Sequence, residues 1–150
     1  MKALIDRFFK PNFERLNQSE PAMAIELATA VLLVEISRAD FDQDQAELDH
    51  IRALLLEHLS LSEQEIDDLL QQAHQEADHL VSVQHITRLM NEQLDQPGKR
   101  KVIEMMWSVV YADGDKHHYE EHLLRKVAEL LYVSHEDFIR ARHLAEQAGA

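Results

Sequence analysis

Two short acidic stretches of nearly the same sequence lie 73 residues apart in this chain of 150 residues. The first reads Ala-Asp-Phe-Asp-Gln-Asp-Gln-Ala-Glu over residues 39–47, and the second reads Ala-Asp-Gly-Asp-Lys-His-His-Tyr-Glu over residues 112–120. Each stretch follows an apolar segment with helical periodicity and precedes another one. Because matched residues keep a nearly constant offset, the chain is predicted to be an internal duplication, with two similar helical units arranged around the acidic loops.

Apolar residues recur at helical spacing along almost the whole chain, and the alternation that is typical of strands is missing. A length of 150 residues with 45% hydrophobic content is enough for one buried core and too little for two independent ones. We therefore predict an all-α fold, a compact single-domain bundle of about seven to eight helices with an internal pseudo-two-fold repeat.

The helices are predicted from their apolar periodicity and from their start and stop signals. Two of them, over residues 21–39 and 97–112, are apolar on nearly every side and belong at the centre, so Met105, Met106 and Trp107 are assigned to the core. Ser62 begins a capping box, Ser134 begins a similar pattern, and the clearest break is predicted at Gln96-Pro97-Gly98. The other predicted helices cover residues 44–59, 62–78, 82–94, 119–131 and 134–147.

An amphipathic segment at residues 1–18 precedes the helical domain, which we place at residues 19–150 with repeats at about 21–80 and 97–147. Within this segment, residues 1–10 place apolar and aromatic side chains along one side and basic ones elsewhere. Such a pattern suits either membrane contact through residues 1–10 or packing on the body of the protein, and we favour packing.

The chain is strongly acidic, with a net charge of −13 from 28 acidic and 15 basic residues. Such a charge repels nucleic acid and favours cations or basic protein surfaces. The sequence has no cysteine, no secretory signal and no apolar run that could span a membrane. We expect a cytoplasmic monomer or weak dimer that has a protein partner and binds no nucleic acid.

The carboxylates of the two loops have the chemistry and spacing to bind a divalent cation. Hard cations such as Ca²⁺ and Mg²⁺ take carboxylate and carbonyl oxygens, which Asp residues at alternate positions of a turn can aim at one centre. The loops do not have the spacing of an EF-hand, because the closing Glu comes at the eighth position and not at the twelfth. The candidate metal ligands are Asp40, Asp42, Asp44, Glu47, Asp113, Asp115 and Glu120.

Helix capping is the competing explanation for these acidic residues. Side-chain oxygens at the start of a helix accept hydrogen bonds from its free N–H groups and interact favourably with the positive end of the helix dipole. Capping does not account for Asp40 and Asp113, which stand at helix C-termini, where the dipole disfavours a carboxylate. It does account, without any ion, for Asp42, Asp44, Glu47, Asp115 and Glu120.

Two further features bear on the ion. Zn²⁺ is an alternative to Ca²⁺ or Mg²⁺, because His118 and His122 lie four residues apart beside the second loop. The His-Glu-x-x-His motif of zinc enzymes is absent, and scattered histidines on an acidic surface are more often solvated. Glu35, one turn before Ala39 in an otherwise apolar helix, either supplies another oxygen ligand or pairs with a basic group such as Arg38.

The segments around both loops resemble the TerB (tellurite-resistance protein B) family. The resemblance rests on Leu-Val-Glu-Ile-Ser-Arg-Ala-Asp at residues 33–40, on Trp-Ser-Val-Val-Tyr-Ala-Asp-Gly-Asp at residues 107–115, and on Glu120 followed by Leu-Leu-Arg-Lys-Val-Ala at residues 123–128. It implies a compact helical domain with pseudo-two-fold symmetry, acidic clusters that bind divalent cations, and a role in bacterial stress response or as an interaction module. The acidic residues carried over by position are Asp40, Asp42, Glu47, Asp113, Asp115 and Glu120.

The two loops differ at one position, where Phe41 in the first loop corresponds to Gly114 in the second. Glycine readily adopts the left-handed conformation that ends many helices, and phenylalanine does so poorly. The second loop is therefore expected to be the better ion site.

No enzyme constellation is visible, since the sequence shows no nucleophile paired with a base, no open catalytic metal motif and no phosphate-binding glycine loop. We therefore expect a non-enzymatic, divalent-cation-binding interaction module of a stress-response type. A purely structural helical adaptor with unliganded acidic loops is the alternative, and a metal-dependent hydrolase is the least favoured interpretation.

Overall fold

The computed structural model describes residues 25–39, 45–79, 82–112 and 118–148. These residues form α-helices and no strand, which confirms the all-α prediction, and none of the described helices is both long and apolar enough to cross a membrane. The amphipathic segment at residues 1–18 lies outside the described residues. The described helices are α2 (Ile25–Ser37), α3 (Gln45–His58), α4 (Glu63–Asp78), α5 (Gln84–Gln93), α6 (Gln96–Val110), α7 (His118–Leu130) and α8 (His135–Ala148).

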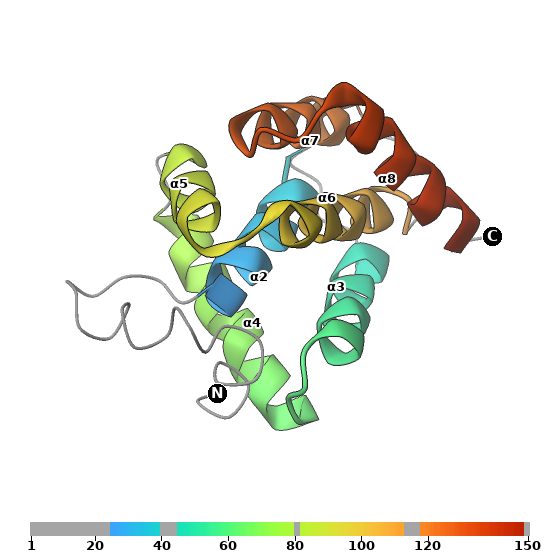
Figure 1. The fold of residues 1–150 in the computed structure, drawn as a ribbon. Coiled ribbons are helices and arrows are strands. Elements are labelled where there is room, and N and C mark those ends of the chain that lie inside the picture. The colour runs from blue at the N-terminus through green and yellow to red at the C-terminus, as the bar shows by residue number, and fades with distance from the viewer. Residues whose placement is uncertain (1–24, 40–44, 80–81, 113–117, 149–150) are drawn as a thin grey trace.

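Helices α2 and α6 cross at the centre of the molecule, and the other helices surround them (Figure 1). Every residue of α2 except Glu35 is buried, as expected for a helix that is apolar on all sides. Helix α6 buries Met105, Met106 and Trp107, which confirms their assignment to the core. Each large apolar side chain that is buried in this way stabilises the fold by roughly 1.5–3 kcal/mol.

The packing of the helices follows the sequence repeat. Helix α2 packs most extensively against α4, and α6 against α8. Helix α3 lies beside α2 and also contacts α6, while α7 lies beside α6 and also contacts α2. This reciprocal set of neighbours is the one that a pseudo-two-fold relation between the halves requires. Helix α5 contacts α2 and α7 and has no counterpart among the described helices.

Two helices begin at the predicted serine caps. At α4, the backbone N–H of Glu65 donates to Ser62 Oγ at 3.2 Å, and the backbone N–H of Ser62 donates to Glu65 Oε1 at 3.0 Å. This reciprocal pair is the predicted capping box. At α8, the backbone N–H of Asp137 donates to Ser134 Oγ at 3.1 Å.

The predicted break between two helices is present but displaced, because Gln96, Pro97 and Gly98 form the first turn of α6. Asp95 is the N-cap, and its carboxylate accepts a hydrogen bond from the backbone N–H of Gly98 at 2.9 Å. Proline is tolerated there, since its missing N–H would have no partner within the helix in any case. The chain passes from α5 to α6 through Leu94 and Asp95, which directly precede the predicted position of the break.

Replacing Ser62 by alanine tests the contribution of the capping box. We expect Ser62→Ala to lower the free energy of unfolding by about 1 kcal/mol, because the backbone N–H of Glu65 loses its side-chain acceptor. The exposed Ser60→Ala is the control and is expected to have little effect. Urea unfolding followed by circular dichroism measures both variants, and equal stabilities would contradict a stabilising role for the box.

Candidate functional site

The structure describes two of the candidate metal ligands, Glu47 and Glu120. Glu47 lies in the first turn of α3 and Glu120 in the first turn of α7, at positions that the 73-residue offset makes equivalent. Both side chains are 0% exposed. The other candidates lie outside the described residues, namely Asp40, Asp42, Asp44, Asp113 and Asp115.

The burial of Glu47 and Glu120 is unusual for acidic residues in a first helical turn. An acid that only complements the helix dipole can remain in water and gains little from being buried. Taking a carboxylate out of water is costly unless hydrogen bonds or a cation compensate it. The chain places such a carboxylate at the same position of both repeats, directly after each acidic loop.

A cation site at either loop would need ligands beyond Glu47 and Glu120. Within the described residues, no three His, Asp or Glu side chains are arranged to hold a metal. His122, one member of the predicted zinc pair, is exposed, and the side chain of His118 lies outside the described structure. Aspartates outside the described residues would have to supply the remaining oxygens.

A side chain from the last turn before each loop makes a polar contact with the final helix of its own repeat. Arg38, two residues before Asp40, forms an ion pair with Asp78 at the end of α4, with Nη2 and Oδ1 2.8 Å apart. At the equivalent position in the second repeat, the Tyr111 hydroxyl donates to Glu146 of α8 at 2.7 Å. The last helical turn before each loop is therefore connected to α4 or α8 by a side-chain contact.

Arg142 and Trp107 make further contacts between α6 and α8 in the second repeat. Arg142 Nε donates to the Tyr111 hydroxyl at 2.8 Å, and the Arg142 guanidinium lies over the Trp107 ring at 5.5 Å. Trp107 also packs against Phe138 of α8, with ring centroids 5.1 Å apart. These contacts join α6 to α8 through rigid side chains.

The expected pairing of Glu35 with Arg38 is wrong, because the ion pair that Arg38 forms is the one with Asp78 of α4. Glu35 is half-buried, and this burial raises the pKa of its carboxyl, while attraction by Arg38 offsets only part of the rise. One turn separates the two residues along the same helix. Packing of α4 against α2 nevertheless brings the Asp78 carboxylate into hydrogen-bonding contact with the guanidinium.

A polar cavity of about 260 Å³ lies between α3, α6 and α8, and it contains a serine and histidine in contact. His50 Nε2 lies 2.6 Å from Ser108 Oγ, and burial lowers the pKa of His50. A nucleophilic serine also needs a group that orients the histidine and free N–H donors for the oxyanion. Ser108 lies inside α6, where the backbone N–H groups serve the helix, so the geometry does not favour a hydrolase.

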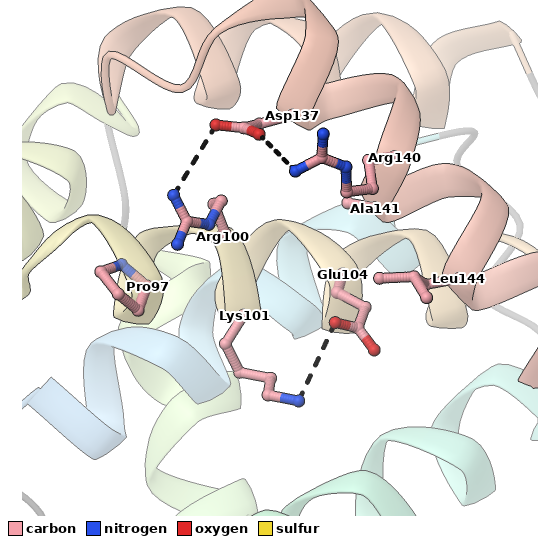
Figure 2. A pocket seen from close by; sticks show the side chains of 8 residues that line it. All are labelled: Pro97, Arg100, Lys101, Glu104, Asp137, Arg140, Ala141 and Leu144. Carbon is pink, nitrogen blue, oxygen red and sulfur yellow. Dashed lines mark hydrogen bonds and ion pairs between the residues drawn. The ribbon is translucent and has the colours of Figure 1, made fainter.

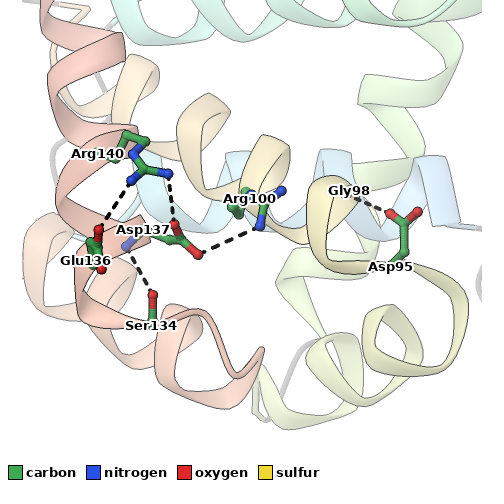
Figure 3. A network of polar contacts seen from close by, with 7 residues as sticks. All are labelled: Asp95, Gly98, Arg100, Ser134, Glu136, Asp137 and Arg140. Carbon is green, nitrogen blue, oxygen red and sulfur yellow. Dashed lines mark hydrogen bonds and ion pairs between the residues drawn. The ribbon is translucent and has the colours of Figure 1, made fainter.

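A second cavity, of about 180 Å³, lies between α6 and α8 and is lined by charged side chains (Figure 2). Asp137 lies between Arg100 and Arg140, at 3.8 Å and 3.4 Å, and Lys101 pairs with Glu104 at 3.8 Å. Figure 3 shows that Ser134 caps the same turn of α8 that carries Asp137. Because each cation already has a carboxylate beside it, the cavity is not a site that favours a free anion.

Glu26, in the first turn of α2, is a buried acid that sequence reasoning missed. Its side chain is 0% exposed, and neither of its carboxyl oxygens has a hydrogen-bond partner among the residues that the structure describes. Burial raises the pKa of Glu26 from 4.5 to about 7. The sequence feature that could have identified Glu26 is a charged residue inside an apolar segment, which is also the feature by which Glu35 was identified.

The raised pKa of Glu26 predicts a pH-dependent stability. The folded state holds the Glu26 proton more tightly than the unfolded chain, so this stabilisation is present below pH 4.5 and is lost as the pH rises through about 7. We expect Glu26→Gln to be more stable than the parent at pH 8, by up to about 3 kcal/mol, and nearly equal to it at pH 4.5.

Urea unfolding at the two pH values measures the effect of Glu26→Gln. The exposed Glu76→Gln on α4 is the matched control and is expected to show no such difference between the two conditions. A parent protein that is at least as stable as Glu26→Gln at pH 8 would contradict the prediction.

Comparison with known proteins identifies the family and agrees with the all-α fold. The family described as tellurite resistance protein TerB matches residues 26–143, which is most of the chain. No curated protein and no solved structure matches it. The matched range contains both loops, Glu47 and Glu120, and all the described helices except the ends of α2 and α8. The chain belongs to the TerB family of tellurite resistance proteins.

Proposed function

We propose that this TerB-family protein is a non-enzymatic interaction module whose acidic loops bind divalent cations, and that it acts in a cytoplasmic stress response. Ca²⁺ or Mg²⁺ fits a set of carboxylate and carbonyl oxygens best, and Zn²⁺ is the alternative if His118 takes part. The observation that carries the proposal is the complete burial of Glu47 and Glu120 at equivalent positions beside the two loops.

In this proposal, Glu47 and Glu120 supply oxygen ligands to the cation from the start of the helix that follows each loop. Asp40 and Asp113 stand next to helix C-termini, where a carboxylate is disfavoured unless a cation is close. One ion at each loop would stabilise both the C-terminal Asp and the buried Glu that follows it. Capping alone addresses only the helix starts, and for this reason we prefer the ion to the purely structural adaptor.

Ligation at a loop would reach the protein surface through the contacts before it. Arg38 connects the first loop to α4, and Tyr111 connects the second loop to α8. A change in the angle of either helix would alter the exposed surface that a protein partner meets. The net charge of −13 makes a basic protein surface, and not nucleic acid, the natural partner.

The proposal predicts that cations stabilise the fold. An ion that binds only the folded state at 100 times its Kd adds about 2.7 kcal/mol, which for a chain of this size raises Tm by roughly 5–10 °C. Calorimetry with Ca²⁺, Mg²⁺, Mn²⁺ and Zn²⁺ at constant ionic strength measures both the shift and the binding isotherm. If none of the four ions binds or moves the transition, the structural-adaptor interpretation holds instead.

The two loops are predicted to bind with unequal affinity. We expect Asp113→Asn to lose more ion affinity than Asp40→Asn, because Gly114 permits a left-handed turn that Phe41 resists by roughly 1 kcal/mol or more. Asp68→Asn on the exposed face of α4 is the charge-matched control. Titration of the three variants with the best-binding ion decides the matter, and a larger loss from Asp40→Asn would reverse the assignment.

A further inference from the structure

A third cavity, of about 200 Å³, lies where α2, α3 and α6 meet, and it differs from the other two because its wall is mostly apolar. Leu59, Leu94, Val102 and Met105 form the apolar part of the wall. An apolar cavity of about 150 Å³ can already bind benzene. The volume is therefore suited to a ligand that is little larger than one aromatic ring.

Two polar groups in the wall are already satisfied by the protein. The Thr29 hydroxyl donates to the backbone carbonyl of Ile25 at 2.9 Å, and the backbone N–H of Gly98 donates to the Asp95 carboxylate at 2.9 Å. Neither group needs a ligand as its partner. The part of a ligand that fills this cavity is thus expected to be apolar.

The ionisable side chains in the wall are Lys101 and His58. No Asp or Glu of the described residues lines this cavity, whereas Glu104 lines each of the other two. Lysine is positive at neutral pH, and histidine is neutral or positive. In a chain with a net charge of −13, the cavity is therefore a place where a negative group meets a cation and no acid.

The Lys101 ammonium is available to such a group. Its side chain is 50% exposed, so the cavity reaches solvent at this residue. Figure 2 shows that Lys101 points away from Asp137 and Arg140. Its ion pair with Glu104 is 3.8 Å long, which exceeds the length of a charge-assisted hydrogen bond, so the ammonium can still donate to another oxygen.

We propose that this cavity, which we call the Lys101 cavity, binds small apolar carboxylic acids. The apolar body of the acid fills the space beside Val102 and Met105, and its carboxylate accepts hydrogen bonds from Lys101. A single ammonium matches a single negative charge. The acidity of the whole chain disfavours anions of higher charge.

The Lys101 cavity is separate from the acidic loops. The first loop joins the end of α2 to the start of α3, whereas Thr29 lies in the first half of α2 and His58 is the last residue of α3. The cavity thus lies at the other end of this helix pair. Binding of an acid is independent of the proposed cation binding, and either proposal can fail without the other.

Three probes that share one ring and differ in charge test the proposal on the full-length protein, namely benzoate, benzyl alcohol and benzylamine. Isotope-labelled methionine methyl groups, followed by NMR, report where each probe binds. Met105 lines the cavity, while the adjacent Met106 and Met90 of α5 are buried elsewhere and are the matched controls. We expect a saturable shift at Met105, tightest for benzoate, weaker for benzyl alcohol and weakest for benzylamine.

The proposal is overturned if no probe shifts Met105 at up to about 10 mM, a concentration at which even weak specific binding is detected. Equal affinities for the three probes would also overturn it, because the cavity would then not select an acid. Shifts of the same size at Met90 and Met106 would indicate binding throughout the core and would have the same consequence.

Replacing Lys101 by methionine removes the charge and keeps an unbranched apolar side chain. We expect Lys101→Met to weaken benzoate binding roughly three- to fivefold, as for a partly exposed ion pair, and to leave benzyl alcohol unchanged. Lys126→Met, on the exposed face of α7, changes the net charge equally and is the control. An equal loss in both variants would show that Lys101 does not bind the carboxylate.

Filling the cavity tests its apolar part. Val102→Phe is expected to abolish the binding of benzoate and benzyl alcohol, because the larger side chain occupies their place. Circular dichroism and thermal unfolding verify that this variant is folded. Unchanged benzoate binding in folded Val102→Phe would place the ligand elsewhere and overturn the proposal, and the Lys101→Met comparison tests it independently if Val102→Phe does not fold.

Discussion

The crossing of α2 and α6 is the constraint on which the rest of the fold depends. Helix α2 is too apolar to face water and needs neighbours on almost every side, whereas α6 buries one face and exposes Lys101 on the other. Helices α4 and α8 provide the largest contacts, and α3 and α7 bridge from one half to the other. The acidic loops follow from this arrangement, because both central helices end where the chain must turn to reach its next helix.

The buried carboxylates are of two kinds, one that occurs in a single repeat and one that occurs at the same position of both repeats. Glu26 has no equivalent acid in the second repeat, where Lys99 occupies its position, and burial raises its pKa to about 7. Glu47 and Glu120 are equivalent to each other, are completely buried and follow the loops directly. Their equivalent positions and complete burial are the observations from which the proposal of cation binding starts.

The departures from symmetry are as informative as the repeat. Helix α5 packs against α2, and α6 carries Lys101 and Glu104 at the positions that correspond to Ala28 and Val31 of α2. Tyr111, in the last turn before the second acidic loop, contacts α8 through Glu146.

Sequence alone determined the helices, the duplication, the family and the capping box at Ser62, because these depend on side-chain periodicity and on hydrogen bonds between residues three or four positions apart. It placed candidate ligands on the loops by chemistry and spacing, but it could not show that Glu47 and Glu120 are buried. Only the tertiary structure decided that Arg38 pairs with Asp78, 40 residues away, and that His50 meets Ser108 across 58 residues. The reason is physical: partners of this kind are chosen by which helix faces pack together, and that choice depends on the whole core and not on any local stretch of chain.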